Sequence, residues 1–153
     1  MKQLTLGFTG TSDGMAPRQL KEVRNLLYSC GTLHLGDCVG ADTEAYHIAG
    51  ETGIHRVGHP PSDGKARSFL DYEETRSELP YMERNLAIAR EGVDGLVAAP
   101  QGWVEINRGR DGGTWSTVRR ARSLGRRIWI VRPDGSVMVE AAGASKLHRR
   151  GVR

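Results

Sequence analysis

The sequence predicts a single α/β domain of Rossmann-like type, with a parallel sheet of about five strands and helices on both faces. Short apolar runs alternate with longer runs of helical spacing, which is the pattern of β-α-β units with right-handed crossovers. The 20 glycines stand mainly where an apolar run ends or a helix begins, which indicates turns. We expect one domain at 1–143 and a basic, flexible tail at 144–153.

The first half of the chain holds three predicted strands and two predicted helices. Pro17 suits the first turn of a helix that continues to about Cys30, and Gly31 can end it. Asp42 can cap the next helix, which Gly53 closes. The predicted strands are 4–9, 32–35 and 54–57.

In the second half, residues 58–79 form a long polar segment, which we interpret as a lid or a pocket wall. Regular alternation then returns, and Pro133-Asp134-Gly135 is a turn that predicts a short C-terminal hairpin. The predicted elements are a helix at 80–91, a strand at 95–99, a helix at 113–123 and strands at 128–131 and 136–139.

The formal net charge of +4 permits contact with nucleic acid, and it equally suits a small anionic ligand. An alternative is that the late arginines form a solvated helix face. Cys30, Cys38 and the five histidines show no spacing typical of a metal site, so we expect no metal and no cofactor. Of the histidines only His59 could face the pocket, and a structural histidine with satisfied hydrogen bonds is the favoured interpretation. With no apolar run of membrane-spanning length and no signal-peptide pattern, the protein is expected to be cytoplasmic and to have no membrane partner.

Three glycine-rich turns predict a pocket for a phosphate-bearing ligand. They lie at strand carboxyl ends, which meet at one edge of a parallel sheet. Glycine lets the backbone approach a ligand closely, and a helix start presents unpaired N–H groups to an anion. Ordinary tight turns and helix caps are the alternative. The predicted binding residues in these turns are Gly10, Thr11, Ser12, Gly36, Asp37, Gly40, Ala41, Asp42, Pro100, Gly112, Gly113, Thr114, Ser116 and Thr117.

Arg84 and Asn85 near the start of the 80–91 helix complete the predicted site. Arginine can hold a phosphate through two parallel hydrogen bonds, although a surface ion pair with Glu83 or Glu91 is an alternative. Trp115 either stacks on a base or packs in the core.

The stretches 81–90, 94–100 and 112–117 resemble the later half of the SLOG superfamily, which includes the LOG-type proteins and the DNA-processing protein DprA. Residues 9–12 and 36–42 are similar to its first two ligand loops, so the resemblance covers about residues 3–132. It is nearest to the small stand-alone phage and bacterial branch. This resemblance implies a nucleotide-binding domain that forms a homodimer or a larger assembly.

LOG enzymes hydrolyse the N-glycosidic bond of nucleoside 5′-monophosphates, and the resemblance implies a matching arginine at Arg84. Their loop glutamate falls at Arg120 in this sequence. Because a carboxylate stabilises the positive charge that develops on the sugar, another acid would have to replace it. Asp42, with Arg84, is the catalytic candidate that we select from the acids Asp13, Asp37, Asp42, Glu83, Glu105 and Asp111.

Three functions therefore stand as hypotheses. The first is binding of a nucleotide or nucleotide-derived ligand for sensing, capture or sequestration. The second is a nucleoside 5′-monophosphate N-glycosidase that releases the base and ribose 5-phosphate. The third is DprA-like binding of nucleic acid, for which the sequence offers basic charge but no recognition motif.

Overall fold

The protein is described by a computed structural model over residues 3–109 and 111–143, so the predicted tail at 144–153 lies outside the described residues. The described part contains one sheet in the strand order β4-β3-β2-β1-β5-β6-β7. The strands are β1 (Leu4–Gly10), β2 (Cys30–Leu35), β3 (His55–Gly58), β4 (Glu74–Thr75), β5 (Gly95–Ala99), β6 (Ile128–Val131) and β7 (Val137–Glu140). The helices are α1 (Pro17–Leu26), the 3-10 helix η1 (Leu27–Ser29), α2 (Ala41–Glu51), α3 (Tyr81–Glu91) and α4 (Gly112–Ser123).

The order of the strands reverses beside β1. The chain adds β2, β3 and β4 on one side of β1, and it then returns to add β5 and β6 on the other side, all of them parallel. In open α/β sheets, ligands bind at the carboxyl ends of the strands where the order reverses. This sheet therefore places the expected pocket beyond the ends of β1 and β5.

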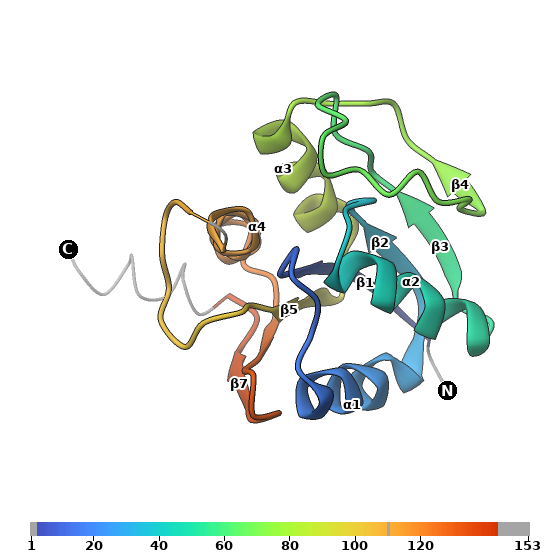
Figure 1. The fold of residues 1–153 in the computed structure, drawn as a ribbon. Coiled ribbons are helices and arrows are strands. Elements are labelled where there is room, and N and C mark those ends of the chain that lie inside the picture. Colours follow the sequence, from blue (N-terminus) through green and yellow to red (C-terminus); the bar gives the residue numbers. More distant parts are fainter. Residues whose placement is uncertain (1–2, 110, 144–153) are drawn as a thin grey trace.

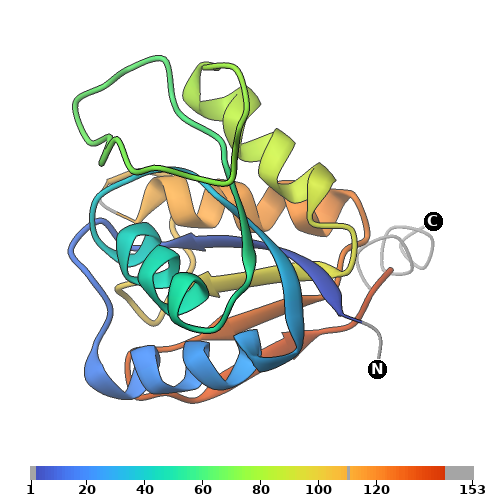
Figure 2. The same ribbon diagram turned by 90° about the vertical axis from the view of Figure 1, so that its right-hand side faces the viewer.

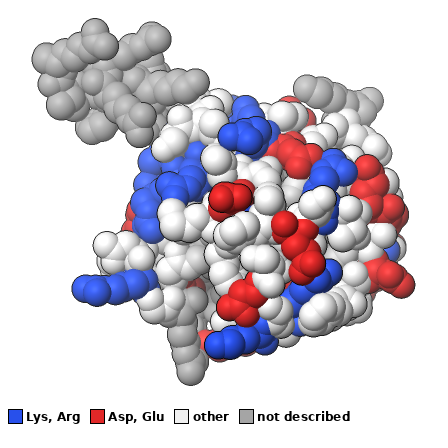
Figure 3. Space-filling model, turned by 90° about the horizontal axis from the view of Figure 1, so that it is seen from above, with Lys and Arg blue, Asp and Glu red and all other residues white. Residues whose placement is uncertain are grey.

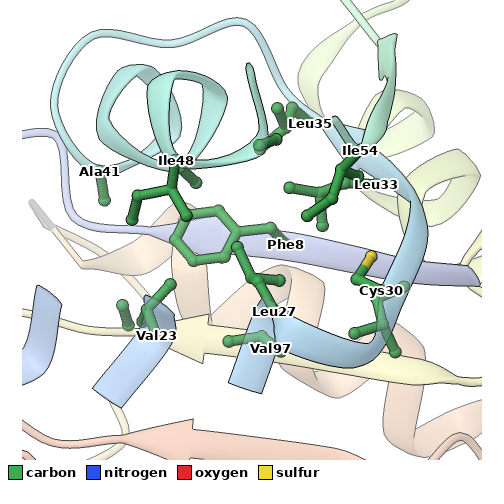
Figure 4. Close-up of a cluster of buried hydrophobic side chains, with 14 of the residues drawn as sticks. Phe8, Val23, Leu27, Cys30, Leu33, Leu35, Ala41, Ile48, Ile54 and Val97 are labelled. Carbon is green, nitrogen blue, oxygen red and sulfur yellow. The ribbon is translucent and has the colours of Figure 1, made fainter. Parts of the chain in front are cut away.

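Two helices cover each face of the sheet. Figure 1 shows α3 and α4 on one side of the strands and α1 and α2 on the other, and the view in Figure 2 agrees. Phe8, Leu33 and Ile48 belong to the buried cluster between the sheet and α2, which Figure 4 shows in close-up. Ile88, Trp115 and Ile130 belong to the second cluster, beneath α3 and α4. The burial of these apolar faces is the main force that holds the layers together.

The predicted fold class is confirmed, including the hairpin in which β7 runs antiparallel to β6. Two details were wrong. The first helix ends at Leu26, because the chain tightens into η1 before β2 begins at Cys30. The strand β4 was missed because it has two exposed residues and pairs only with Val57 and Gly58. No helix in the described ranges is both long enough and apolar enough to cross a bilayer.

Candidate functional site

The first two glycine-rich turns pack directly against each other. A Cβ on Gly10 would lie 2.5 Å from the Cβ of Ala41, and one on Gly40 would lie 2.4 Å from the carbonyl oxygen of Ser12. Gly40 also has a φ of +89°, which L side chains rarely adopt. The N–H of Ala41 donates to the carbonyl of Thr11 at 2.9 Å. These glycines therefore serve to join the turns, and the space beside the joined turns becomes the pocket wall.

A cavity of about 150 Å³ lies at the carboxyl ends of β1 and β2. It brings together seven of the predicted residues, which come from both turns, from α3 and from the start of α4: Gly10, Ser12, Asp42, Arg84, Asn85, Gly113 and Thr114. Four further lining residues were not selected from the sequence: Thr9, Cys38, Ala66 and Tyr81. Ala66 belongs to the 58–79 segment, so that segment does contribute to the pocket wall.

Arg84 is held rigidly at the back of this cavity. Its side chain is buried, and Nη1 donates to the carbonyl of Gly36 and to that of His59, the latter at 3.3 Å. Nε donates to Oδ1 of Asn85 at 2.9 Å. Within the described residues, the only hydrogen-bond partner of Nη2 is the weakly accepting Cys38 thiol, at 3.8 Å, so its strong donor capacity remains for a ligand. The surface ion pair considered from the sequence does not form.

Asp42 faces the same cavity on the other side of Gly36. A Cβ on Gly36 would lie 2.8 Å from Nη1 of Arg84 and 2.9 Å from Oδ2 of Asp42, so only glycine fits between them. The N–H of Cys38 donates to Oδ2 of Asp42 at 3.2 Å. Burial raises the pKa of Asp42 to about 6, against the opposing effect of the Arg84 charge. A carboxyl group that titrates near neutrality in a pocket is typical of functional sites.

The start of α4 forms the opposite wall. Gly113 and Thr114 lie in its first turn, where an α-helix leaves N–H groups without intrahelical acceptors. A Cβ on Gly113 would meet no atom within 4 Å, so the space above this residue is open. Just before the helix, the buried carboxylate of Asp111 accepts hydrogen bonds from the N–H groups of Gln101 and Gly102 at 2.9 and 2.8 Å. Asp111 therefore fixes the loop that precedes the helix.

A larger groove of about 720 Å³ adjoins the cavity, and both are lined by Tyr81, Asn85 and Gly113. Ser116, a predicted ligand residue, lies in this groove together with Arg119 and Arg120, which were not predicted there. Its other lining residues are Met82, Asn107 and Gly109. The combined space can hold a small group in the cavity and a longer part of the same molecule in the groove.

Asp37 has a different environment from the other predicted residues. Its fully buried carboxylate accepts hydrogen bonds from four donors of the 58–79 segment. They are Nε of Arg67 at 2.7 Å, Oγ of Ser68 at 3.0 Å, the N–H of Leu70 at 3.2 Å and the hydroxyl of Tyr72 at 3.0 Å. The carboxylate therefore anchors this segment over the sheet edge and does not line the cavity.

The remaining predicted residues do not line the cavity, and they pack or form hydrogen bonds in the segments around it. The carbonyl of Pro100 accepts a hydrogen bond from the side chain of Gln19 at 2.8 Å. The hydroxyl of Thr117 donates to the carbonyl of Gly113 at 3.1 Å, and Trp115 is packed in the core. Thr11, Gly36, Gly40, Ala41 and Gly112 likewise lie next to the cavity without lining it.

A buried pair of histidines lies beyond the Arg84 site. Nδ1 of His34 is 2.9 Å from Nε2 of His59, and that nitrogen is 3.6 Å from Oε2 of Glu91. Burial lowers the pKa of both imidazoles, that of His59 to about 4, so both rings are neutral near pH 7. His59 therefore does not line the cavity, and its ring contacts His34 as a structural histidine, which is the interpretation that the sequence favoured. Linear spacing could not reveal this cluster, since its members come from three separate segments of the chain.

Comparison with solved structures supports the fold. No family model matches the sequence, and neither does any curated protein. The molybdenum cofactor binding protein from the phototrophic bacterium Rippkaea orientalis matches with a TM-score of 0.64 and 19% identity, over 98% of this chain and 85% of that one. The structural genomics protein TM1055 matches with a TM-score of 0.57 and 19% identity, over 84% of this chain and 72% of that one.

DNA processing protein A (DprA) from Streptococcus pneumoniae matches with a TM-score of 0.62 and 18% identity. The match covers 99% of this chain, which spans only 57% of that protein. The three matches agree with the Rossmann-like fold predicted from the sequence. Identities this low show the shared Rossmann-like fold alone.

Proposed function

We propose that this protein binds a nucleotide or a nucleotide-derived molecule beyond the carboxyl ends of the strands, with an anionic group in the small cavity at the ends of β1 and β2. The proposal depends on one observation: the buried guanidinium of Arg84 and the first turn of α4 line the same cavity. A guanidinium and a helix start both favour an anion, and together they can donate several hydrogen bonds to one phosphate.

The two volumes favour a ligand with two parts. At about 150 Å³ the cavity is smaller than typical ligand pockets of roughly 300–1,000 Å³, so it suits a small group such as a phosphate better than a whole nucleotide. The adjoining groove of 720 Å³ is within the range of ligand pockets, roughly 300–1,000 Å³. We therefore assign the phosphate to the cavity and the sugar and base to the groove.

Isothermal titration with inorganic phosphate and a panel of nucleoside mono-, di- and triphosphates tests this proposal. Arg84→Met should weaken binding at least about tenfold, because hydrogen bonds to charged groups contribute about 1.5–3 kcal/mol. Arg90→Met is the matched control, since Arg90 is exposed on the same helix and does not line the cavity. Failure of the whole panel to bind, or equal affinity in Arg84→Met and the wild type, would contradict the proposal.

Asp42 favours a second candidate function, hydrolysis of the N-glycosidic bond of a nucleoside monophosphate. Arg120, at the position of the expected glutamate, lines the groove and cannot stabilise positive charge on a sugar. The buried carboxyl of Asp42 lies in the cavity and could take over that role. Chromatography of the wild type with nucleoside monophosphates should then show free base, and Asp42→Asn should release none while it still binds. If the wild type releases no free base, the hydrolase function is contradicted and ligand binding alone remains as the proposed function.

A third candidate, nucleic-acid binding, is favoured by the DprA match and by Arg119 and Arg120 in the groove. On the face seen in Figure 3, however, basic and acidic side chains of the described residues are interspersed, and no long basic stripe runs across it. Gel-shift measurements with single- and double-stranded DNA at low and physiological salt separate this function from the others. Binding by this surface should fall steeply with salt.

A further inference from the structure

We propose that His34, His59 and Glu91 form a binding site for a divalent transition-metal ion such as Zn²⁺, separate from the cavity that Arg84 lines. The three side chains come from β2, from the residue after β3 and from the last residue of α3. Their potential ligand atoms all lie within 4.8 Å of one another. Two imidazoles and one carboxylate are a donor set that proteins use for zinc, with the fourth position left to water.

Two of the three separations between ligand atoms are close to those around a tetrahedral ion. Zinc–nitrogen and zinc–oxygen bonds of about 2.0–2.1 Å place two ligand atoms roughly 3.3 Å apart. The pair His34 Nδ1 and His59 Nε2 is 2.9 Å apart, and His59 Nε2 and Glu91 Oε2 are 3.6 Å apart. These two separations bracket the required value. The third, between His34 and Glu91, is within 4.8 Å, so the partly exposed Glu91 carboxylate would move towards His34 by up to about 1.5 Å to seat the ion.

The protonation of the histidines is compatible with this change. In the metal-free protein, one proton between His34 Nδ1 and His59 Nε2 suffices for their hydrogen bond. Binding an ion moves that proton to the distal nitrogen of the same ring, so both facing lone pairs become available and no net proton is released. The metal replaces one hydrogen bond by two coordinate bonds.

Arg76 orients the third ligand. Its Nη2 donates to Oε1 of Glu91 at 2.8 Å, and its Nε makes only a longer hydrogen bond, of 3.4 Å, to Oε2, the oxygen nearer to His59. A hydrogen bond to the second oxygen of a ligating carboxylate is a common way to fix its direction. The positive charge of Arg76 weakens binding of a cation, but its side chain is 39% exposed and can move towards water. Glu91 is 32% exposed, so an ion can reach the site from that side.

The site is connected to the cavity through the backbone. His59 supplies one of the two carbonyls that accept hydrogen bonds from Arg84. Gly36, two residues after His34, supplies the other. A metal that holds both histidines therefore also restrains the two carbonyls that position Arg84.

Titration of the chelator-treated protein with Co²⁺ and Zn²⁺ tests the proposal. We expect a single equivalent of Co²⁺ to give the visible absorption bands of a four-coordinate ion, and Zn²⁺ to displace it and to raise the melting temperature. His59→Gln and Glu91→Gln should each weaken binding at least about tenfold. His55→Gln is the control, because His55 is an exposed histidine on the neighbouring strand and is not in the cluster.

No cobalt bands with the wild type, or undiminished binding in either cluster variant, would overturn the proposal. If His59→Gln does not fold, Glu91→Gln still tests the proposal, because Glu91 is only partly buried and its substitution should disturb folding less. The ¹⁵N shifts of the His34 and His59 rings in the wild type give a further test. They should change on addition of Zn²⁺, and unchanged shifts at saturating metal would place the ion elsewhere. These readouts do not depend on whether the protein binds nucleotides.

Discussion

Single residues in this protein carry roles that their residue type alone would not reveal. Asp37 and Asp42 stand five positions apart in one glycine-rich turn, and both were selected from the sequence as ligand residues. The structure places Asp42 in the cavity wall and directs Asp37 to donors of the 58–79 segment. The sequence showed that carboxylates gather here, but the partners of each carboxylate come from segments far along the chain.

Gly113 offers the sharpest test of the cavity at the level of one residue. A methyl group here would enter open space, and φ is not in the left-handed region, so Gly113→Ala should fold normally. Because alanine favours helix, the variant should be up to about 1 kcal/mol more stable. The methyl group would enter the proposed phosphate position, so the variant should bind a nucleotide at least about tenfold more weakly in isothermal titration.

Gly112→Ala is the matched control for this variant. Gly112 is the neighbouring residue of the same helical turn, it lines neither the cavity nor the groove, and a Cβ there would make ordinary contact with Asn107 at 3.7 Å. It should gain similar stability and keep its affinity. Equal affinities for the Gly112 and Gly113 variants would show that the phosphate does not lie over Gly113.

At the level of elements, the strands and helices with strong apolar patterns were predictable, and the 58–79 segment was not. That segment contains only the two-residue strand β4, and its arrangement follows from tertiary contacts. The hydroxyl of Tyr46 on α2 donates to the carbonyl of Asp71, and the carboxylate of Asp37 accepts four hydrogen bonds from 67–72. No local periodicity encodes such contacts.

Asp37→Ala should therefore release the segment. Loss of the buried carboxylate leaves Arg67 and three neutral donors without their acceptor, which should lower the free energy of unfolding by about 3 kcal/mol. Urea denaturation measures this loss, and trypsin should cleave the variant faster after Lys65 and Arg67. Asp63→Ala, an exposed position in the same segment, should stay within about 0.5 kcal/mol of the wild type. Equal stability of the two variants would argue against the anchoring role.

For the molecule as a whole, the site introduces a pH dependence into folding. The pKa of Asp42 is raised from 3.8 to about 6 in the folded protein, so the folded state holds this proton more tightly than the unfolded chain. The contribution of the protonated Asp42 carboxyl to the free energy of unfolding is complete below about pH 4, and it is lost as the pH rises to about 6. The ionised carboxylate then costs on the order of 3 kcal/mol.

Asp42→Asn removes this titration and keeps an oxygen that can accept from the N–H of Cys38. Urea unfolding of both proteins across this range should show the variant gaining stability relative to the wild type as the pH rises from about 4 to 6. Above the pKa of Asp42, the difference in unfolding free energy between the variant and the wild type should stay constant. A difference independent of pH would mean that Asp42 titrates normally, and its assignment as the catalytic carboxyl would lose its support.

The sequence by itself determined the α/β class, the β6–β7 hairpin and the edge of the sheet where the unusual turns gather. Apolar periodicity and glycine placement are local properties, and parallel strands bring their carboxyl ends together in any such sheet. Only the tertiary structure decided which polar groups meet. In the folded protein, Arg84 donates to two carbonyls that follow different strands. Asp37 accepts hydrogen bonds from the 58–79 segment and does not line the cavity. His34, His59 and Glu91 lie together outside the cavity. Hydrogen-bond partners and ligand distances depend on through-space geometry, which sequence spacing does not contain.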